Sequence, residues 1–419
     1  MIRRVILTTV LMGTAAAITA QPARFDDVVR NLRNPDPKTR LGAVRLLREA
    51  RYPEAIVPLA PLVNDPVDAI QLEAIAAELS FFLVNDVPEK RKLGFVVEVR
   101  NRGTAAEAFE MGPLAIWPRP APPELLNALL KAVDDENARV RLEAIYAAAT
   151  IPRGATIPRG QLSLDAEEML IKALDHYDPV VRAGAAHFAG RAGIKAAVDA
   201  LIKSVGDSNA DVRYASMRAL GLLREERAVA TLVEQLKLYG KGEGAWSAVD
   251  ALAHIASAST VSVFTERLAD KDPYLRRAAA EGLGRLGHTA SMSALETGAG
   301  SDPAATARAA MAFALQKMGR SYVPRLIEFL DDRDRKVVVQ VQEYLLELGG
   351  TVEKDLLPSL QDPDEGLRAA VADVLGAIGG DASLAALRDL KDRDKNVVDA
   401  AQRAVERIKM RPSTTLKAP

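Results

Sequence analysis

Asp178-Pro179-Val180-Val181-Arg182 opens a pattern that returns along the chain about every 31 residues. The pattern is an Asp or Asn turn, often with Pro, then a hydrophobic residue and Arg, then a stretch rich in Ala, Leu and Gly. It begins again at Asn209-Ala210-Asp211-Val212-Arg213, at Asp272-Pro273-Tyr274-Leu275-Arg276, and at Asp362-Pro363, which leads to Leu367-Arg368. The four arginines are 31, 63 and 92 residues apart in succession. Such a fixed period is typical of a stacked repeat array.

One period predicts two short helices joined by a polar turn. Hydrophobic residues recur at helical spacing in residues 196–205 and again in residues 211–223, and residues 207–210 form the turn between them. The Asp or Asn of the turn can accept from free N–H groups in the first turn of the second helix, where Pro loses no hydrogen bond. The second helices are expected to start near Lys38, Val67, Ala138, Val180, Asp211, Glu243, Tyr274, Ala304, Arg335, Glu365 and Lys395.

The composition is that of a large folded protein with helical packing. Of 419 residues, 48% are hydrophobic and only 5% are aromatic, so Ala and Leu carry the core. The 55 basic and 56 acidic residues leave no net field to attract nucleic acid, and we expect no nucleic-acid partner. Cysteine is absent, which excludes disulfides and thiolate metal sites.

The first twenty residues have the pattern of a secretory signal peptide. Arg3 and Arg4 precede an apolar run from Val5 to Ala20 that ends in small residues. The run is too short, and too diluted by threonine, to favour a membrane anchor. We therefore expect export, to the periplasm or as a secreted protein, and a mature chain without a transmembrane segment.

The repeated residues resemble the HEAT repeat family, and most closely the HEAT-like repeats first named from phycobilisome lyases. The resemblance depends on the Asp-Pro turn, the Val-Arg pair and an Ala-Leu-Gly type of ending, as at Ala219-Leu220-Gly221 and Val374-Leu375-Gly376. It implies an all-α fold, a right-handed α-α superhelix of about eleven helix pairs with the second helices on the concave face. It is specific for fold and not for function.

The resemblance also implies a ladder in which turn Asp and helix Arg side chains pair within and between repeats. The structural ladder would then consist of Arg141, Arg182, Arg213, Arg276, Arg308 and Arg368. Ala245, Val338 and Val398 occupy the Arg position of their repeats, so the ladder should be weaker there.

The periodicity divides the chain into a signal peptide (1–20), N-terminal repeats (24–84), an irregular insertion (85–123), a repeat array (124–410) and a disordered tail (411–419). The insertion is rich in β-branched residues at first and in proline after Trp117. It is either a decorated repeat whose Trp117 fills a gap between neighbouring repeats, which we favour, or a loop on the binding face. A hexapeptide at residues 149–154 is repeated at 155–160, which lengthens a surface loop.

Motifs for catalysis or cofactor binding are not supported. Gly282-Leu283-Gly284-Arg285-Leu286-Gly287 matches a dinucleotide fingerprint, but it ends a helix instead of linking a strand to a helix. None of the four histidines is followed by Glu, unlike the His-Glu pairs by which HEAT-like deoxyhypusine hydroxylases hold two irons. The sequence therefore predicts no catalytic residue, no cofactor and no metal, and a protein that is not an enzyme.

The concave face offers the best candidate site. The positions one and five residues after each ladder position should face outward from the core. Four adjacent repeats place aromatic and charged residues there, and Tyr and Arg are frequent in binding hot spots. The predicted partner-binding residues are Tyr146, His187, Tyr214, Arg218, Trp246 and Asp250. Alternatively, some of these rings fill spaces between helices.

Three functions remain open. We favour a non-enzymatic exported scaffold that binds a protein or peptide on its concave face. The second is a lyase-type or chaperone-like subunit that handles a tetrapyrrole or another prosthetic group, which the family resemblance suggests and which the leader and the lack of Cys oppose. The third is a purely structural envelope assembly protein. The sequence does not indicate an oligomeric state.

Overall fold

The computed structural model describes residues 24–85, 105–153 and 163–411. The predicted signal peptide, the first part of the insertion, the whole second hexapeptide and nearly all of the predicted tail lie outside these residues. The described residues contain no strand, and only an isolated bridge joins Leu83 to Ile116. None of the described helices combines the length and the apolar character needed to cross a membrane.

The predicted superhelix of eleven helix pairs is confirmed in the part of the chain that the structure describes. Each second helix begins within one residue of its expected start. The second helices are α2 (Pro37–Ala50), α4 (Asp68–Phe82), α7 (Ala138–Thr150), α9 (Pro179–Ala192), α11 (Ala210–Leu222), α13 (Gly242–Ile255), α15 (Pro273–Leu286), α17 (Ala305–Lys317), α19 (Arg335–Leu348), α21 (Glu365–Ile378) and α23 (Lys395–Met410).

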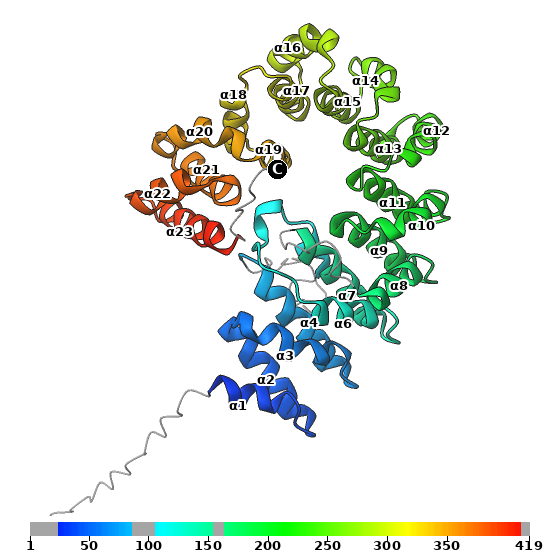
Figure 1. Ribbon diagram of the computed structural model, residues 1–419, viewed down its shortest axis with the longest axis vertical. Helices are drawn as coiled ribbons and strands as arrows, with labels where there is room; N and C mark the ends of the chain where they lie inside the picture. The colour runs from blue at the N-terminus through cyan, green and yellow to red at the C-terminus, as the bar shows by residue number, and fades with distance from the viewer. Residues whose placement is uncertain (1–23, 86–104, 154–162, 412–419) are drawn as a thin grey trace, which may run out of the picture.

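The first helices are shorter, and several are preceded or followed by a 3-10 turn. They are α1 (Phe25–Asn31), α3 (Ile56–Leu59), α6 (Pro123–Ala132), α8 (Leu164–Ala173), α10 (Val198–Ser204), α12 (Val229–Tyr239), α14 (Val261–Arg267), α16 (Met292–Ser301), α18 (Val323–Glu328), α20 (Glu353–Leu356) and α22 (Asp381–Asp389). From α8 onward they lie on the outside of the curve, and the second helices line its inner face (Figure 1).

Glycine and alanine let neighbouring second helices approach closely. A Cβ atom on Gly221 would lie 2.7 Å from the Cα of Ala251, and one on Gly284 would lie 2.5 Å from the Cα of Ala314. Such distances leave no room for a side chain. The Gly of the Ala-Leu-Gly ending is therefore required where one inner helix contacts the next.

The arginine that follows each turn joins that turn to the next one. Nε and Nη2 of Arg182 donate to the carboxylate of Asp207 at 2.8 and 2.9 Å, while Nη1 donates to the carbonyl of His176 at 2.8 Å. The same bidentate geometry joins Arg276 to the carboxylate of Asp302, at 2.7 and 2.8 Å. Paired N–H donors match a carboxylate in both geometry and charge.

The other predicted ladder arginines show the same arrangement with different partners. Arg368 pairs with Asp392, Arg141 donates to Asp178, and Nε of Arg213 donates to the hydroxyl of Tyr239 at 2.6 Å. Arg308 donates to the carbonyls of its own turn, at Asp302 and Pro303. Each predicted arginine therefore contacts a turn, and the partner of the next repeat varies.

The described part of the insertion, residues 105–122, crosses from the N-terminal repeats to the last one; we call it the strap. It contains α5 (Ala105–Phe109) and a 3-10 turn at Pro113–Ala115. Arg407 of α23 donates to the carbonyls of Ile116 and Leu114, both at 2.7 Å. The strap and the red end of the ribbon meet in Figure 1, so the array from α7 to α23 closes into a ring.

Trp117 of the strap lies against α23, the last helix of the array. The guanidinium of Arg407 lies 5.4 Å from the centre of the Trp117 ring. The Trp117 backbone N–H donates to the carbonyl of Phe82 at 2.8 Å. The prolines after Trp117 prevent the strap from forming a helix. The strap therefore stays extended across the closed ring of repeats. Burial lowers the pKa of Arg407 to about 10.

A carboxyl group is buried in α4 where most other repeats have leucine. Glu78 is inaccessible to solvent, and neither of its oxygens has a hydrogen-bond partner among the described residues. It stands seven residues after Gln71, as Leu220 does after Arg213 and Leu283 after Arg276. Burial raises its pKa well above the usual value.

We predict that Arg407→Ala opens the ring. The variant loses two hydrogen bonds from a buried cation and should lower the free energy of unfolding by about 1.5–3 kcal/mol. The radius of gyration of the mature chain, measured by small-angle X-ray scattering, should increase. Arg403→Ala is the control, because Arg403 pairs with Asp373 at the same end of the array. An unchanged radius in the Arg407 variant would contradict ring closure by this residue.

We predict that Glu78→Leu increases the free energy of unfolding at pH 7 by about 1–3 kcal/mol. Since the folded-state pKa is raised, the contribution of Glu78 to stability is complete below pH 4.5 and is lost as the pH rises through that pKa. Urea unfolding at pH 5 and pH 8 should show a smaller difference in the variant than in the wild type. Glu78→Gln is the control, which should remove the same pH dependence with a smaller gain. Equal pH dependence in all three proteins would show that Glu78 does not titrate as proposed.

Candidate functional site

A cleft of about 190 Å³ opens on the concave face where the strap crosses the second helices α7, α9, α11 and α13. Four of the six predicted partner-binding residues line it: Tyr146, His187, Tyr214 and Arg218. They come from three successive repeats and share the positions one and five residues after the ladder residue. The strap adds Phe109 and Glu110, which the concave register did not predict.

Aromatic rings form the base of the cleft under the strap. Phe109 packs edge-on against Tyr146, with ring centres 5.4 Å apart, and its centre lies 4.8 Å from that of His187. The guanidinium of Arg191 lies 3.7 Å from the centre of the Phe109 ring. Because Phe109 is buried by these contacts, the strap is fixed on the face that the repeats alone would leave open.

The charges at the rim are predominantly acidic. Glu110 and Asp211 are exposed and form no ion pair or hydrogen bond through their carboxylates with any described residue. Arg218 pairs with Glu243 at 3.2 Å. Burial raises the pKa of Tyr146, and the nearby carboxylates of Glu110 and Asp211 raise it further. The cleft therefore has two carboxylates without a cationic partner.

His187 is neutral at physiological pH. Burial lowers its pKa to about 3, and the positive charges of Arg191 and Arg218 act in the same direction. A neutral imidazole can both donate and accept a hydrogen bond. The cleft consequently gains a hydrogen-bonding group from His187 and no positive charge.

Trp246 lies outside the cleft and serves as a ladder residue. Its Nε1 donates to the carboxylate of Asp272 at 2.6 Å, and its ring stacks on Tyr274 with the centres 4.3 Å apart. Ala245 occupies the Arg position of this repeat, where we expected a weaker ladder. The indole supplies the missing donor, so Trp246 follows the alternative in which a ring fills the space between repeats.

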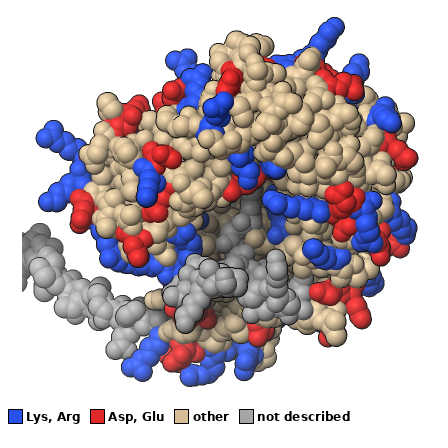
Figure 2. Space-filling model, turned by 45° about the horizontal axis from the view of Figure 1, so that its top comes forward, with Lys and Arg blue, Asp and Glu red and all other residues tan. Residues whose placement is uncertain are grey.

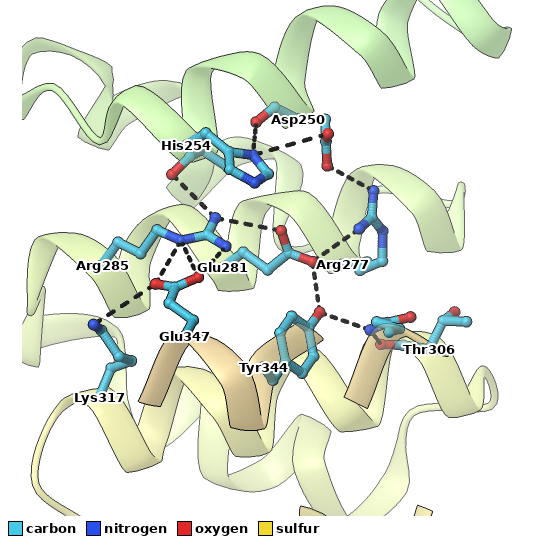
Figure 3. A network of polar contacts seen from close by, with 11 residues as sticks. Asp250, His254, Arg277, Glu281, Arg285, Thr306, Lys317, Tyr344 and Glu347 are labelled. Atoms are coloured by element: carbon cyan, nitrogen blue, oxygen red, sulfur yellow. Dashed lines mark hydrogen bonds and ion pairs between the residues drawn. The ribbon is translucent and has the colours of Figure 1, made fainter. Parts of the chain in front are cut away.

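Asp250 also lies outside the cleft, in a polar network on the inner face (Figure 3). Its carboxylate accepts from Arg277 at 2.8 Å. Burial raises the pKa of Asp250, but the charges of Arg277, His254, Arg218 and Arg285 outweigh burial and lower it to about 2. Asp250 therefore stays ionised and paired at physiological pH.

The centre of this network is Glu281, which joins helices two repeats apart. It accepts from Arg277 of its own helix α15 at 2.9 Å and from the hydroxyl of Tyr344 in α19 at 2.5 Å. Arg285 of α15 pairs with Glu347 of α19 at 2.8 Å (Figure 3). Because α15 and α19 meet over α17, the array bends sharply at this point.

The bend overturns one expectation about the concave face. The position five residues after the ladder residue was expected to face outward in every repeat. Glu281 is only 1% exposed and Phe313 is fully buried, with its ring stacked on Tyr344 at 4.4 Å. Close approach of α19 covers both side chains, which a position within one repeat cannot reveal.

The cleft and the polar network differ in how their charged groups are paired. Within residues 24–85, 105–153 and 163–411 no group of three or more His, Cys, Asp or Glu side chains is placed to bind a metal. In the network of Figure 3, every carboxylate contacts a cation or a hydroxyl. Acidic and basic side chains are intermixed over the face seen in Figure 2. The cleft, with aromatic rings and unpaired carboxylates, is the place suited to recognition.

We predict that Trp246→Phe destabilises the array without changing the cleft. The phenyl ring can still stack on Tyr274, but the hydrogen bond to Asp272 is lost, so the free energy of unfolding should fall by about 1–3 kcal/mol. Urea unfolding of the variant and the wild type measures this difference in the free energy of unfolding. Tyr146→Phe is a suitable control, because Tyr146 lines the cleft and its hydroxyl makes no hydrogen bond with the ladder residues of the described chain. Equal stability of the Trp246 variant and the wild type would show that the indole does not act as a ladder donor.

Three solved structures are similar to this chain. An engineered protein is 21% identical, with a TM-score of 0.40, and the match covers 92% of this chain and 98% of that one. The complex of CpcE and CpcF of phycocyanin lyase from a Nostoc species is 16% identical, with a TM-score of 0.34 and coverage of 80% and 98%. The YibA protein of E. coli is 17% identical, with a TM-score of 0.40 and coverage of 71% and 93%.

No curated protein matches the chain in sequence. A family profile described as HEAT repeats matches residues 167–238, 242–316 and 323–406. These segments make up more than half of the chain and cover most of the residues from α8 to α23. The chain therefore belongs to the HEAT repeat family.

Proposed function

We propose that this protein is a non-enzymatic scaffold, exported from the cytoplasm, that binds a protein or peptide in the concave cleft under the strap. The observation that supports this most directly is the cleft itself. Residues from four repeats and the strap converge there, and they include aromatic rings and two carboxylates without a cationic partner among the described residues. Concave surfaces of stacked repeats are extended binding surfaces, and Tyr and Arg are enriched among residues that dominate binding energy.

The size of the cleft favours a protein segment over a prosthetic group. Small-molecule and cofactor sites commonly have volumes of about 300–1,000 Å³. The cleft, at about 190 Å³, is smaller and opens onto the concave face. A side chain from a bound segment fits this volume, while the backbone of that segment would lie along the inner helices.

Export is part of the proposal and is supported by the first twenty residues. Arg3 and Arg4 followed by the apolar run to Ala20 are the pattern of a signal peptide. We propose that the mature chain acts in the periplasm or outside the cell. Fractionation of cells that express the full-length chain with a C-terminal tag would locate it.

A photo-crosslinking experiment tests binding in the cleft. A photoreactive amino acid at Val180, which lines the cleft and is 38% exposed, should capture a specific partner from envelope extract. The same amino acid at Leu164, which is 79% exposed on an outer helix, should not. The captured partner is then purified and titrated against the mature chain.

The affinity of that partner should fall at least tenfold in Tyr146→Ala/Tyr214→Ala, because two rings of the cleft are removed. Tyr52→Ala/Tyr177→Ala is the matched control, since it removes two exposed tyrosines outside the cleft. Circular dichroism should show that both variants keep their helices. Equal loss in the two variants, or capture of the same proteins from Val180 and Leu164, would contradict binding in the cleft.

A further inference from the structure

We propose that the cleft under the strap binds the cationic side chain of a lysine or arginine in the partner segment. This inference rests on the proposed function and specifies its ligand. It depends on the charges at the rim, on the rings at the base and on the size of the cleft.

The charged groups that line the cleft leave a surplus of negative charge. Three carboxylates, those of Glu110, Asp211 and Glu243, line the cleft together with one guanidinium, that of Arg218. A second guanidinium, that of Arg191, lies against Phe109 at the base, so carboxylates outnumber guanidinium groups by one. Arg218 is already paired with Glu243, so it offers little to an incoming anion. Glu110 and Asp211 have no cationic partner among the described residues. A cation that entered between them would gain charge-assisted hydrogen bonds at a partly desolvated position.

The rings of the cleft suit the same ligand. An ammonium or guanidinium group is attracted to the face of an aromatic ring within about 6 Å. The cluster already shows this contact, because the guanidinium of Arg191 lies 3.7 Å from the centre of Phe109. Tyr146 and Tyr214 line the same cleft. A side chain entering there meets two rings next to two carboxylates.

His187 is the remaining polar group of the cleft and does not oppose a cation. Its ring nitrogens have no hydrogen-bond partner among the described residues, and with a pKa of about 3 it carries no charge. One of these nitrogens can accept from the bound ammonium or guanidinium group. The base of the cleft thus offers an acceptor where a protonated histidine would repel the ligand.

Three peptides test the charge of the ligand. They are fluorescein-labelled, eleven residues long and made of Gly and Ser, except for a central Arg-Leu-Arg, Gln-Leu-Gln or Glu-Leu-Glu. Fluorescence anisotropy with the mature chain measures their affinity. The arginine peptide should bind at least tenfold more tightly than the glutamine peptide. Equal affinity of these two peptides, or tighter binding of the glutamate peptide, would overturn the inference.

Two double variants locate the binding. Glu110→Gln/Asp211→Asn should weaken binding of the arginine peptide at least fivefold. Asp165→Asn/Glu168→Gln changes the net charge by the same amount on the outer helix α8 and should leave the affinity within twofold of the wild type. If both variants weaken binding equally, the attraction is non-specific and the inference is wrong.

The same variants separate this inference from the proposed function. The partner captured from Val180 is titrated against Glu110→Gln/Asp211→Asn and against Tyr146→Ala/Tyr214→Ala. Loss of affinity in both variants supports a cationic ligand in the cleft. Loss in the tyrosine variant alone would leave the proposed function in place and overturn the cationic ligand. Loss in neither variant would overturn both.

Discussion

A guanidinium near the start of most second helices satisfies its own turn and, in several repeats, fixes the next turn. Arg182 donates to the carbonyls of its own turn and, through its other two nitrogens, to the carboxylate of Asp207 in the following repeat. A polar turn would otherwise leave carbonyl groups without partners next to an apolar core. Because one side chain makes both sets of bonds, the position of each turn determines that of its neighbour. The stacking of the whole array depends on this contact.

The concave face follows from the stacking and from two contacts that reach further than one repeat. Gly and Ala bring the inner helices together, as at Gly284 and Ala314. Glu281 and Arg285 then join α15 to α19, which increases the curvature. Finally Arg407 holds the strap. The inner face of an open solenoid thereby becomes the inside of a ring, and the strap provides one wall of the cleft.

The fold could be predicted from the sequence because its signal is local and repeated. Turn, cap and apolar spacing recur within each period, so all eleven second helices were placed to within one residue. Tyr146, His187 and Tyr214 line one cleft because they share a register along adjacent repeats.

The other parts of the site depend on contacts that cannot be predicted from the position of a residue within its repeat. Phe109 and Glu110 belong to a segment without the repeat pattern, and their aromatic and acidic character was the only available signal. Trp246 has the register of a binding residue but donates to a turn, because Ala245 leaves that turn without its arginine. Glu281 is covered by a helix two repeats away.

Ring closure changes how this repeat protein can fold and unfold. A linear solenoid can lose repeats one at a time from either end, because each repeat contacts only its neighbours. Here the last helix is bonded to a residue 291 positions earlier. Fraying from the C-terminal side therefore requires the strap to detach, and only the helices α1 to α4 resemble a free end. During synthesis the strap emerges long before α23, so the wall of the cleft receives its final support only when the last repeat has been made.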